Sequence, residues 1–258
     1  MSNALHAEWT KLRTVSATGW LLLSAIVLTV ALSAVVALAV TYNSTGSGED
    51  ITKLSLAGIY VGQAIVAIFA VQSISAEYST GMIRVTLTAI PRRPTLLAAK
   101  AAVLTAPILA AGAVAVLGSV LAGRLILPAN GFTAAHGYAL LSLSHGPTLR
   151  AAFGSVLYLG LIALLSLGVA TAVREPAVAI GIVLGLLFLF PILAALVGDP
   201  SLKRHLQQLG PMTAGLAIQT TTNLHHLPIT PWAGLGVLAA WATAALLVAG
   251  LLLRRRDA

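Results

Sequence analysis

The chain has 258 residues, of which 58% are hydrophobic and only 9% charged, and its mean hydropathy is +0.96. This composition excludes an ordinary soluble domain and indicates an integral membrane protein. The formal net charge of +8 would also suit nucleic acid, but the basic residues are scattered at the ends of apolar runs. That distribution argues against a nucleic-acid surface and suits topology signals and anionic lipid headgroups. The absence of cysteine excludes disulfides and thiolate sites.

The first predicted element is an amphipathic helix over residues 2–16, lying in the membrane interface. Leu5, Trp9 and Leu12 share one helical face, and Trp9 suits the headgroup level. Six apolar runs follow, and each is long enough for a bilayer core that needs about 20 residues. They span roughly 17–40, 55–76, 98–122, 151–173, 176–197 and 232–253, with Lys100 at the edge of the third. The sequence therefore predicts an all-α polytopic membrane protein in which residues 1–258 form a single transmembrane domain.

A long polar stretch, residues 77–94, separates the second run from the third. If it continues as a helix, Glu77, Gly81, Arg84 and Thr88 share one face, which predicts an amphipathic helix with a small residue in its polar face. Glu77 ends the preceding helix, where the helix dipole disfavours a negative charge, so the charge must be compensated, and we expect it to pair with Arg84 or with a basic residue of a partner. The alternative is a solvated loop whose arginines only set the membrane orientation.

Six crossings place both ends of the chain on one side of the membrane. Ten of the fifteen basic residues, Lys100 included, lie on that side, which predicts cytoplasmic termini. On the same side Arg174, Glu175 and Pro176 predict a tight turn between the fourth and fifth helices, because each residue suits its helix end. On the outer side, residues 200–210 predict a polar helix, and residues 212–219 predict an apolar piece that dips back against other helices.

Polar residues in the second run predict a translocation path. Tyr60, Gln63 and Ala67 share one stripe, which we assign to the wall of a cavity, with Gln72 on the far side as a contact to another helix. A buried amide without a partner costs roughly 2–7 kcal/mol, so Gln63 must meet water, substrate or another helix. The alternative is that both glutamines are packing contacts.

Two Gly-x-x-x-Gly motifs predict close approaches between helices. Gly58 and Gly62 lie in the second run, and Gly181 and Gly185 lie in the fifth. The small side chain lets two helix backbones come together. Each contact is either within the chain or with a second copy.

The sequence contains no G-x-x-x-x-G-K-[ST] motif, so it has no P-loop with which to bind ATP. Apart from Lys100 the six apolar cores lack ionisable residues, which argues against intramembrane proteolysis and against a proton-coupled carrier. We therefore expect no catalytic residue, metal site or cofactor on this chain. A metal site or pH sensor among the histidines of the predicted outer loops is a minor alternative. Those histidines are His136, His145, His205, His225 and His226.

Four stretches together resemble ABC-2-type transporter permeases, particularly those of actinobacteria. They are AEWTKLRT, AEYSTGMIRVTLTAIPRRPTLLAAKA, LGPMTAGLAIQ and TPWAGLGVLAAWATAALLVAGLLLRRRDA, of which the second is the most specific. The resemblance implies six membrane helices, cytoplasmic termini, a second permease copy or paralogue, and two separate P-loop ATPase subunits that bind ATP and Mg²⁺. It also implies that the N-terminal amphipathic segment is the connecting helix and that the second and fifth helices face the partner protomer. The coupling helix that meets the ATPase then includes Glu77, Tyr78, Gly81, Met82 and Arg84.

These features favour the permease subunit of an ATP-driven exporter in a bacterial cell membrane. The cargo class is a small molecule, drug, peptide or lipid, and ATP hydrolysis belongs to the partner subunit. The alternative from another class is a regulatory or immunity-type membrane protein that binds a partner without transport. A membrane-embedded hydrolase that uses loop histidines is disfavoured by the lack of cysteine and of carboxylates in the apolar runs.

Overall fold

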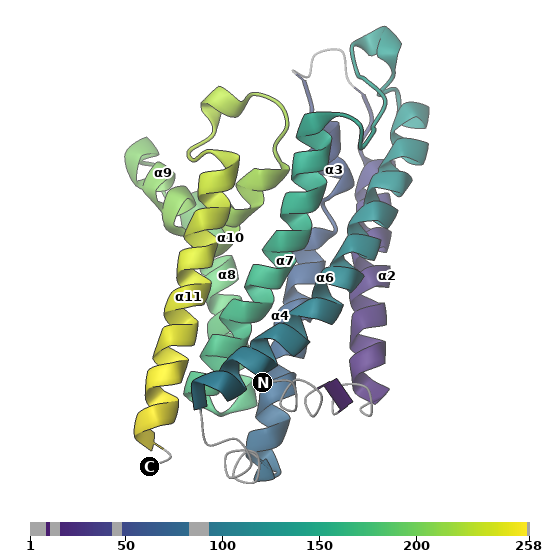
Figure 1. The fold of residues 1–258 in the computed structure, drawn as a ribbon. Helices are drawn as coiled ribbons and strands as arrows, with labels where there is room; N and C mark the ends of the chain where they lie inside the picture. The colour runs from purple at the N-terminus through teal and green to yellow at the C-terminus, as the bar shows by residue number, and fades with distance from the viewer. Residues whose placement is uncertain (1–8, 11–15, 43–47, 83–92, 257–258) are drawn as a thin grey trace.

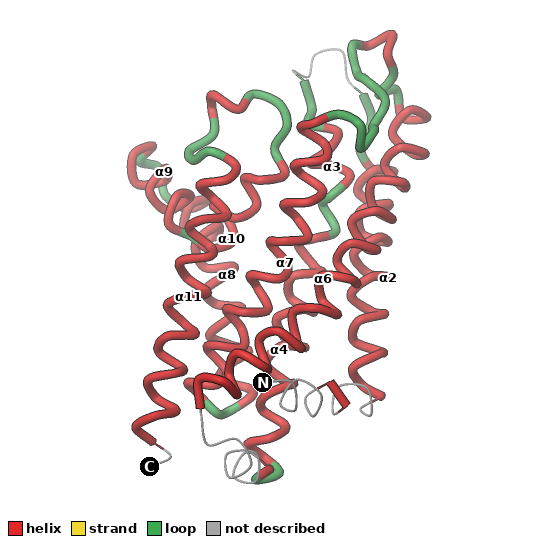
Figure 2. The backbone as a smooth tube through the Cα atoms, viewed as in Figure 1, coloured by secondary structure: helices red, strands yellow, loops and turns green. Residues whose placement is uncertain are grey.

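The computed structural model describes residues 9, 10, 16–42, 48–82 and 93–256. Within these ranges the fold is all-α, no strand occurs, and six helices are long and apolar enough to cross a membrane. Figure 1 shows the long helices running side by side, and Figure 2 shows the loops gathered at the ends of the bundle. The chain is a multi-pass membrane protein, which confirms the prediction from its hydropathy.

The membrane-length helices are α2 (Ser16–Ala39), α4 (Ile59–Ser79), α6 (Arg93–Ile126), α7 (Gly146–Val173), α8 (Pro176–Leu196) and α11 (Pro231–Arg256). In the described part of the chain the shorter α-helices are α3 (Ile51–Ser55), α9 (Pro200–Leu209) and α10 (Pro211–Gly215). The short 3-10 helices there are η1 (Leu127–Asn130), η2 (Ala134–His136), η3 (Leu216–Gln219) and η4 (Leu224–His226).

The second and third apolar runs differ from their predicted bounds. The second begins later than predicted, at Ile59, because a turn follows α3, and it extends to Ser79. The third begins earlier than predicted, at Arg93, with Pro94 in its first turn. A proline is compatible with a first turn because the N–H groups there have no partner within the helix.

The chain leaves α4 by a sharp turn. The helix ends at Ser79, and Gly81 has the left-handed φ of +70°, a conformation that glycine adopts without steric cost. The prediction of one continuous amphipathic helix from Glu77 through Gly81 and beyond is therefore wrong. Arg84 lies outside the described residues, as does most of the N-terminal helix predicted at 2–16. Of that helix Trp9 and Thr10 are described, and both are helical and exposed.

Helix α7 lies at the centre of the bundle and packs against α4, α6, α8 and α11, while α2 packs against α4 and α6. Helix α10 is almost fully buried against α8 and α11, and η3 is buried against α7 and α11, which confirms that the apolar piece at 212–219 packs among other helices. The ends of α4 and α11 and the starts of α2 and α6 meet at one end of the bundle, here called the Lys100 end (Figure 1). The opposite end carries α3, α9, η2 and η4 and is called the Asp50 end.

Candidate functional site

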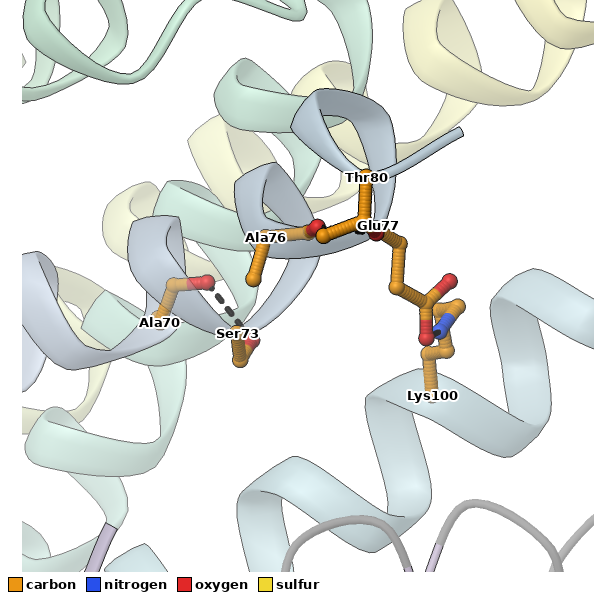
Figure 3. A network of polar contacts seen from close by, with 6 residues as sticks. All are labelled: Ala70, Ser73, Ala76, Glu77, Thr80 and Lys100. Atoms are coloured by element: carbon orange, nitrogen blue, oxygen red, sulfur yellow. Dashed lines mark hydrogen bonds and ion pairs between the residues drawn. The ribbon is translucent and has the colours of Figure 1, made fainter. Parts of the chain in front are cut away.

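A buried ion pair joins α4 to α6 at the Lys100 end. The Lys100 ammonium nitrogen lies 2.5 Å from Oε1 of Glu77, and the two side chains are only 6% and 9% exposed (Figure 3). A buried charge is strongly unfavourable unless an opposite charge pairs with it, and this contact pairs the two buried side chains. Glu77 lies in the last turn of α4, where the helix dipole opposes a carboxylate, and Lys100 compensates it. Lys100 was not the predicted pair, and Arg84, which was, lies outside the described residues. Glu77 lies before the connection between the two helices and Lys100 lies after it.

A second contact ties the turn between α7 and α8 to the same end of α4. The Arg174 guanidinium carbon lies 5.3 Å from the centre of the Tyr78 ring, within the range of a cation–π interaction. Arg174 ends α7 with a φ of 67°, and the Glu175 carboxylate caps α8 by accepting from the N–H groups of Ala177 and Val178. The tight turn predicted from Arg174, Glu175 and Pro176 is confirmed. The connection between α4 and α6 and the turn between α7 and α8 therefore meet beside Glu77 and Tyr78.

Two further residues assigned to the predicted coupling helix lie just beyond α4. Gly81 is exposed, and no other described atom lies within 4 Å of the position that a Cβ would take. A substitution at Gly81 would therefore be strained by the backbone conformation rather than by crowding. Met82 is helical and 46% exposed. Glu77, Tyr78, Gly81 and Met82 thus cluster at the Lys100 end.

Gln63 lies inside the bundle rather than on a cavity wall. Its side chain is fully buried, its carbonyl oxygen accepts from the Tyr158 hydroxyl of α7, and its amide donates to the Met212 sulfur at 3.2 Å. Tyr60 is 40% exposed, whereas Ala67 is 2% exposed, so the predicted stripe does not line one open surface of this chain. The structure supports the alternative for Gln63, a packing contact between α4, α7 and α10.

Gln72 lies on an outward face of α4, although it was assigned to a helix contact. It is exposed, and so are Val61 and Ala76, with half-buried Ile65 and Ile68 between them along the helix. Hydrocarbon is a poor neighbour for an amide, because nothing in it forms a hydrogen bond. Gln63 therefore makes the kind of helix contact that was predicted for Gln72, and among the described residues no helix covers the face that carries Gln72.

The two Gly-x-x-x-Gly motifs have different surroundings. A Cβ at Gly58 would lie 1.8 Å from the Thr29 carbonyl oxygen, and one at Gly62 would lie 2.4 Å from the Thr29 hydroxyl oxygen. The first motif is therefore a contact within the chain, between α4 and α2. Around Gly181 and Gly185 of α8, no other described atom lies within 4 Å of a Cβ position. The second motif faces outward.

Replacing Gln63 is expected to destabilise the protein more than replacing Gln72. Gln63→Leu leaves the buried Tyr158 hydroxyl without its acceptor, which costs about 1–3 kcal/mol, whereas Gln72→Leu removes an exposed amide. The measurement is the midpoint of thermal unfolding of the purified protein in detergent. As a control, Tyr158→Phe combined with Gln63→Leu should recover part of the loss, because both partners are then apolar. Equal midpoints for the two single variants would contradict the assignment.

The Asp50 carboxylate, which the sequence interpretation did not single out, joins two loops at the opposite end. It caps α3 by accepting from the N–H of Lys53 and also accepts from the N–H and hydroxyl of Thr221, at 2.5 and 2.8 Å. Arg150 adds a bond from its guanidinium to the Thr220 carbonyl oxygen. These contacts join α3, the start of α7 and the segment at Thr220 and Thr221 at the Asp50 end. Only the position of Asp50 directly before a helix start could have indicated its capping role.

The histidine of η2, His136, is held by contacts within the chain. The His136 ring stacks on Tyr42 with centroids 4.1 Å apart, and its Nδ1 lies 2.7 Å from the Gly131 carbonyl oxygen. Across the described part of the chain, no group of three or more His, Cys, Asp or Glu side chains could hold a metal ion.

In comparisons with known proteins, no family model matches the chain and no curated protein matches it.

Proposed function

We propose that the chain is the permease subunit of an ATP-driven exporter of the ABC-2 type, in a bacterial cell membrane. Two copies of a P-loop ATPase bind its cytoplasmic side and carry the ATP and Mg²⁺, and a second permease protomer completes the path. The cargo is a small molecule, drug, peptide or lipid that leaves the cytoplasm.

The observation that carries this proposal is the buried pair between Glu77 and Lys100. It fixes both ends of the polar connection between α4 and α6 to the bundle, so a force applied to that connection would move two membrane helices. The contact of Tyr78 with Arg174 extends the same attachment to α7 and α8. The Lys100 end, where the basic residues concentrate, is then the cytoplasmic end, with both termini on that side.

The absence of a motor in the sequence supports a separate ATPase. The chain has no P-loop motif, and its apolar runs have no ionisable residue deep within them that could couple transport to protons. Energy for transport must then come from a partner that binds outside the membrane.

The outward face of α4 supports a second protomer. Gln72 is exposed on that face, and the outward glycines Gly181 and Gly185 lie on α8, which packs against α4. A second copy would bury the amide and exploit the small residues for a close approach. The substrate path then lies between the two protomers, and Tyr60 is the member of the predicted stripe that is exposed to it.

Co-purification tests this function. A tagged chain, solubilised in mild detergent from cells that express it naturally, is expected to retain a subunit that hydrolyses ATP. A chain that purifies reproducibly without any nucleotide-binding subunit, while staying folded, would favour the non-transporting regulatory or immunity-type protein instead.

A further inference from the structure

Helix α9 is amphipathic and lies at the periphery of the Asp50 end. Leu202, Leu206 and Leu209 share one face, and Lys203, Arg204 and Gln207 lie on the other. Leu202 and Leu209 are 49% and 59% exposed, and α9 packs against α8, whose last residue, Leu196, is 78% exposed. In a membrane protein, such leucines face acyl chains, and an amphipathic helix in that position lies in the interface with its polar face among the headgroups.

Two hydrogen bonds hold α9 in place. The Trp241 indole N–H of α11 donates to the Leu209 carbonyl oxygen at 3.0 Å, which anchors the end of the helix. The Gln208 amide donates to the Pro228 carbonyl oxygen at 2.7 Å, which joins α9 to the segment after η4. Figure 1 shows α9 beside α11 and near the end of α8. The space between α9 and η4 is therefore bounded by two connected elements.

That space is a basic groove of about 330 Å³. Lys203 and Arg204 line one wall, and His225 and His226 line the other, with Gln207 beside them. Among the described residues of the lining, every ionisable side chain is a Lys, an Arg or a His. The Asp199 carboxylate at the start of α9 lies outside the lining and accepts from the N–H and hydroxyl of Ser201. Arginine binds a phosphate through two parallel N–H bonds, and lysine adds a point charge.

Lys203 and Arg204 lie at the Asp50 end, whereas the sequence assigns most basic residues of the chain to the opposite, Lys100 end. If the Lys100 end is cytoplasmic, Lys203 and Arg204 lie on the outer side, where basic residues are disfavoured as topology signals. A local binding role explains their placement better than topology does.

We infer that the groove between α9 and η4 binds the phosphate group of an anionic phospholipid in the leaflet at the Asp50 end. The Arg204 guanidinium and the Lys203 ammonium contact the phosphate oxygens, and the imidazoles of His225 and His226 and the Gln207 amide complete the site with N–H donors. The lipid tails lie in the layer that the exposed leucines of α8 and α9 face. The inference does not depend on whether the protein is an exporter.

Lipid binding to the purified full-length chain tests this inference by native mass spectrometry. The detergent-solubilised protein is titrated with phosphatidylglycerol or with phosphatidylcholine carrying the same acyl chains. We expect phosphatidylglycerol to bind at least about tenfold more tightly, since it carries a net negative charge and phosphatidylcholine does not. Lys203→Gln combined with Arg204→Gln should abolish this preference, whereas the swap Lys203→Arg with Arg204→Lys should keep most of it.

The matched control is Lys53→Gln combined with Arg124→Gln. Both residues are exposed at the same end of the bundle but lie outside the groove, so the preference should persist. Equal binding of the two lipids, or an equal loss in the control, would overturn the inference. A third arm adds glycerol 3-phosphate; if it binds as tightly as the lipid, the site belongs to a soluble phosphate compound and the lipid assignment is wrong.

Discussion

Lys100→Met is expected to be among the most destabilising substitutions in this chain, by about 3–5 kcal/mol, because it leaves the Glu77 carboxylate in a buried position without its nearest cation. Methionine keeps most of the length of the lysine side chain, so the loss reports the charge rather than a large cavity. The measurement is thermal unfolding in detergent, followed by the intrinsic tryptophan fluorescence.

A double-mutant cycle separates the ion pair from the packing around it. Glu77→Gln alone removes the negative charge of the ion pair with Lys100 and should also destabilise the protein. Glu77→Gln combined with Lys100→Met should lose less stability than the sum of the two single changes. The coupling free energy is expected to exceed about 1 kcal/mol, as for directly contacting charges. Additive effects would mean that the two residues act independently, and the proposed attachment of α4 to α6 would be wrong.

Gly58→Val is expected to prevent the contact between α2 and α4 from forming, and so to prevent the protein from folding. A Cβ at Gly58 would lie 1.8 Å from the Thr29 carbonyl oxygen, which is backbone, and 2.7 Å from the Ser33 hydroxyl oxygen. That hydroxyl accepts from the Gly58 N–H at 3.0 Å, so separating the helices would also break a buried hydrogen bond. Overpacking of a buried contact typically costs about 1–3 kcal/mol, and a backbone clash costs more. Expression and monodispersity in size-exclusion chromatography measure the outcome.

The matched control is Gly181→Val in α8, where no other described atom lies within 4 Å of the new Cβ position. This variant should fold as the unchanged chain does. If the α8 face meets a second protomer, its self-association in detergent should weaken, as measured by light scattering. Normal folding of Gly58→Val would contradict the close approach between α2 and α4.

Hydropathy and end-of-helix chemistry were sufficient to predict the membrane helices. The six apolar runs each became a long helix, and the sequence Arg174, Glu175, Pro176 specified a turn by local rules of capping. Local conformation was harder to foresee where a single residue decides it. The left-handed backbone at Gly81 ends α4, although the spacing of the surrounding residues is compatible with a continuous helix.

Contacts between helices could not be predicted from one helix at a time. Periodicity places Gln63 and Gln72 on opposite faces of α4 but does not say which face meets α7, and Gln63 was therefore assigned to a cavity wall although it packs against α7. The pair of Glu77 with Lys100 likewise depends on how α4 and α6 pack, which no spacing within either helix reveals. The basic groove joins α9 to η4, and these segments also come together only in the folded chain.

Photo-cross-linking from Met82 tests most directly the claim that the Lys100 end receives an ATPase. Met82 is 46% exposed just beyond α4, and Asn223 is exposed at the Asp50 end. A photoreactive residue replacing Met82 in cells is expected to cross-link to an ATP-hydrolysing subunit, while the same residue replacing Asn223 is expected not to. A cross-link to that subunit from Asn223 but not from Met82 would reverse the proposed orientation and contradict the account.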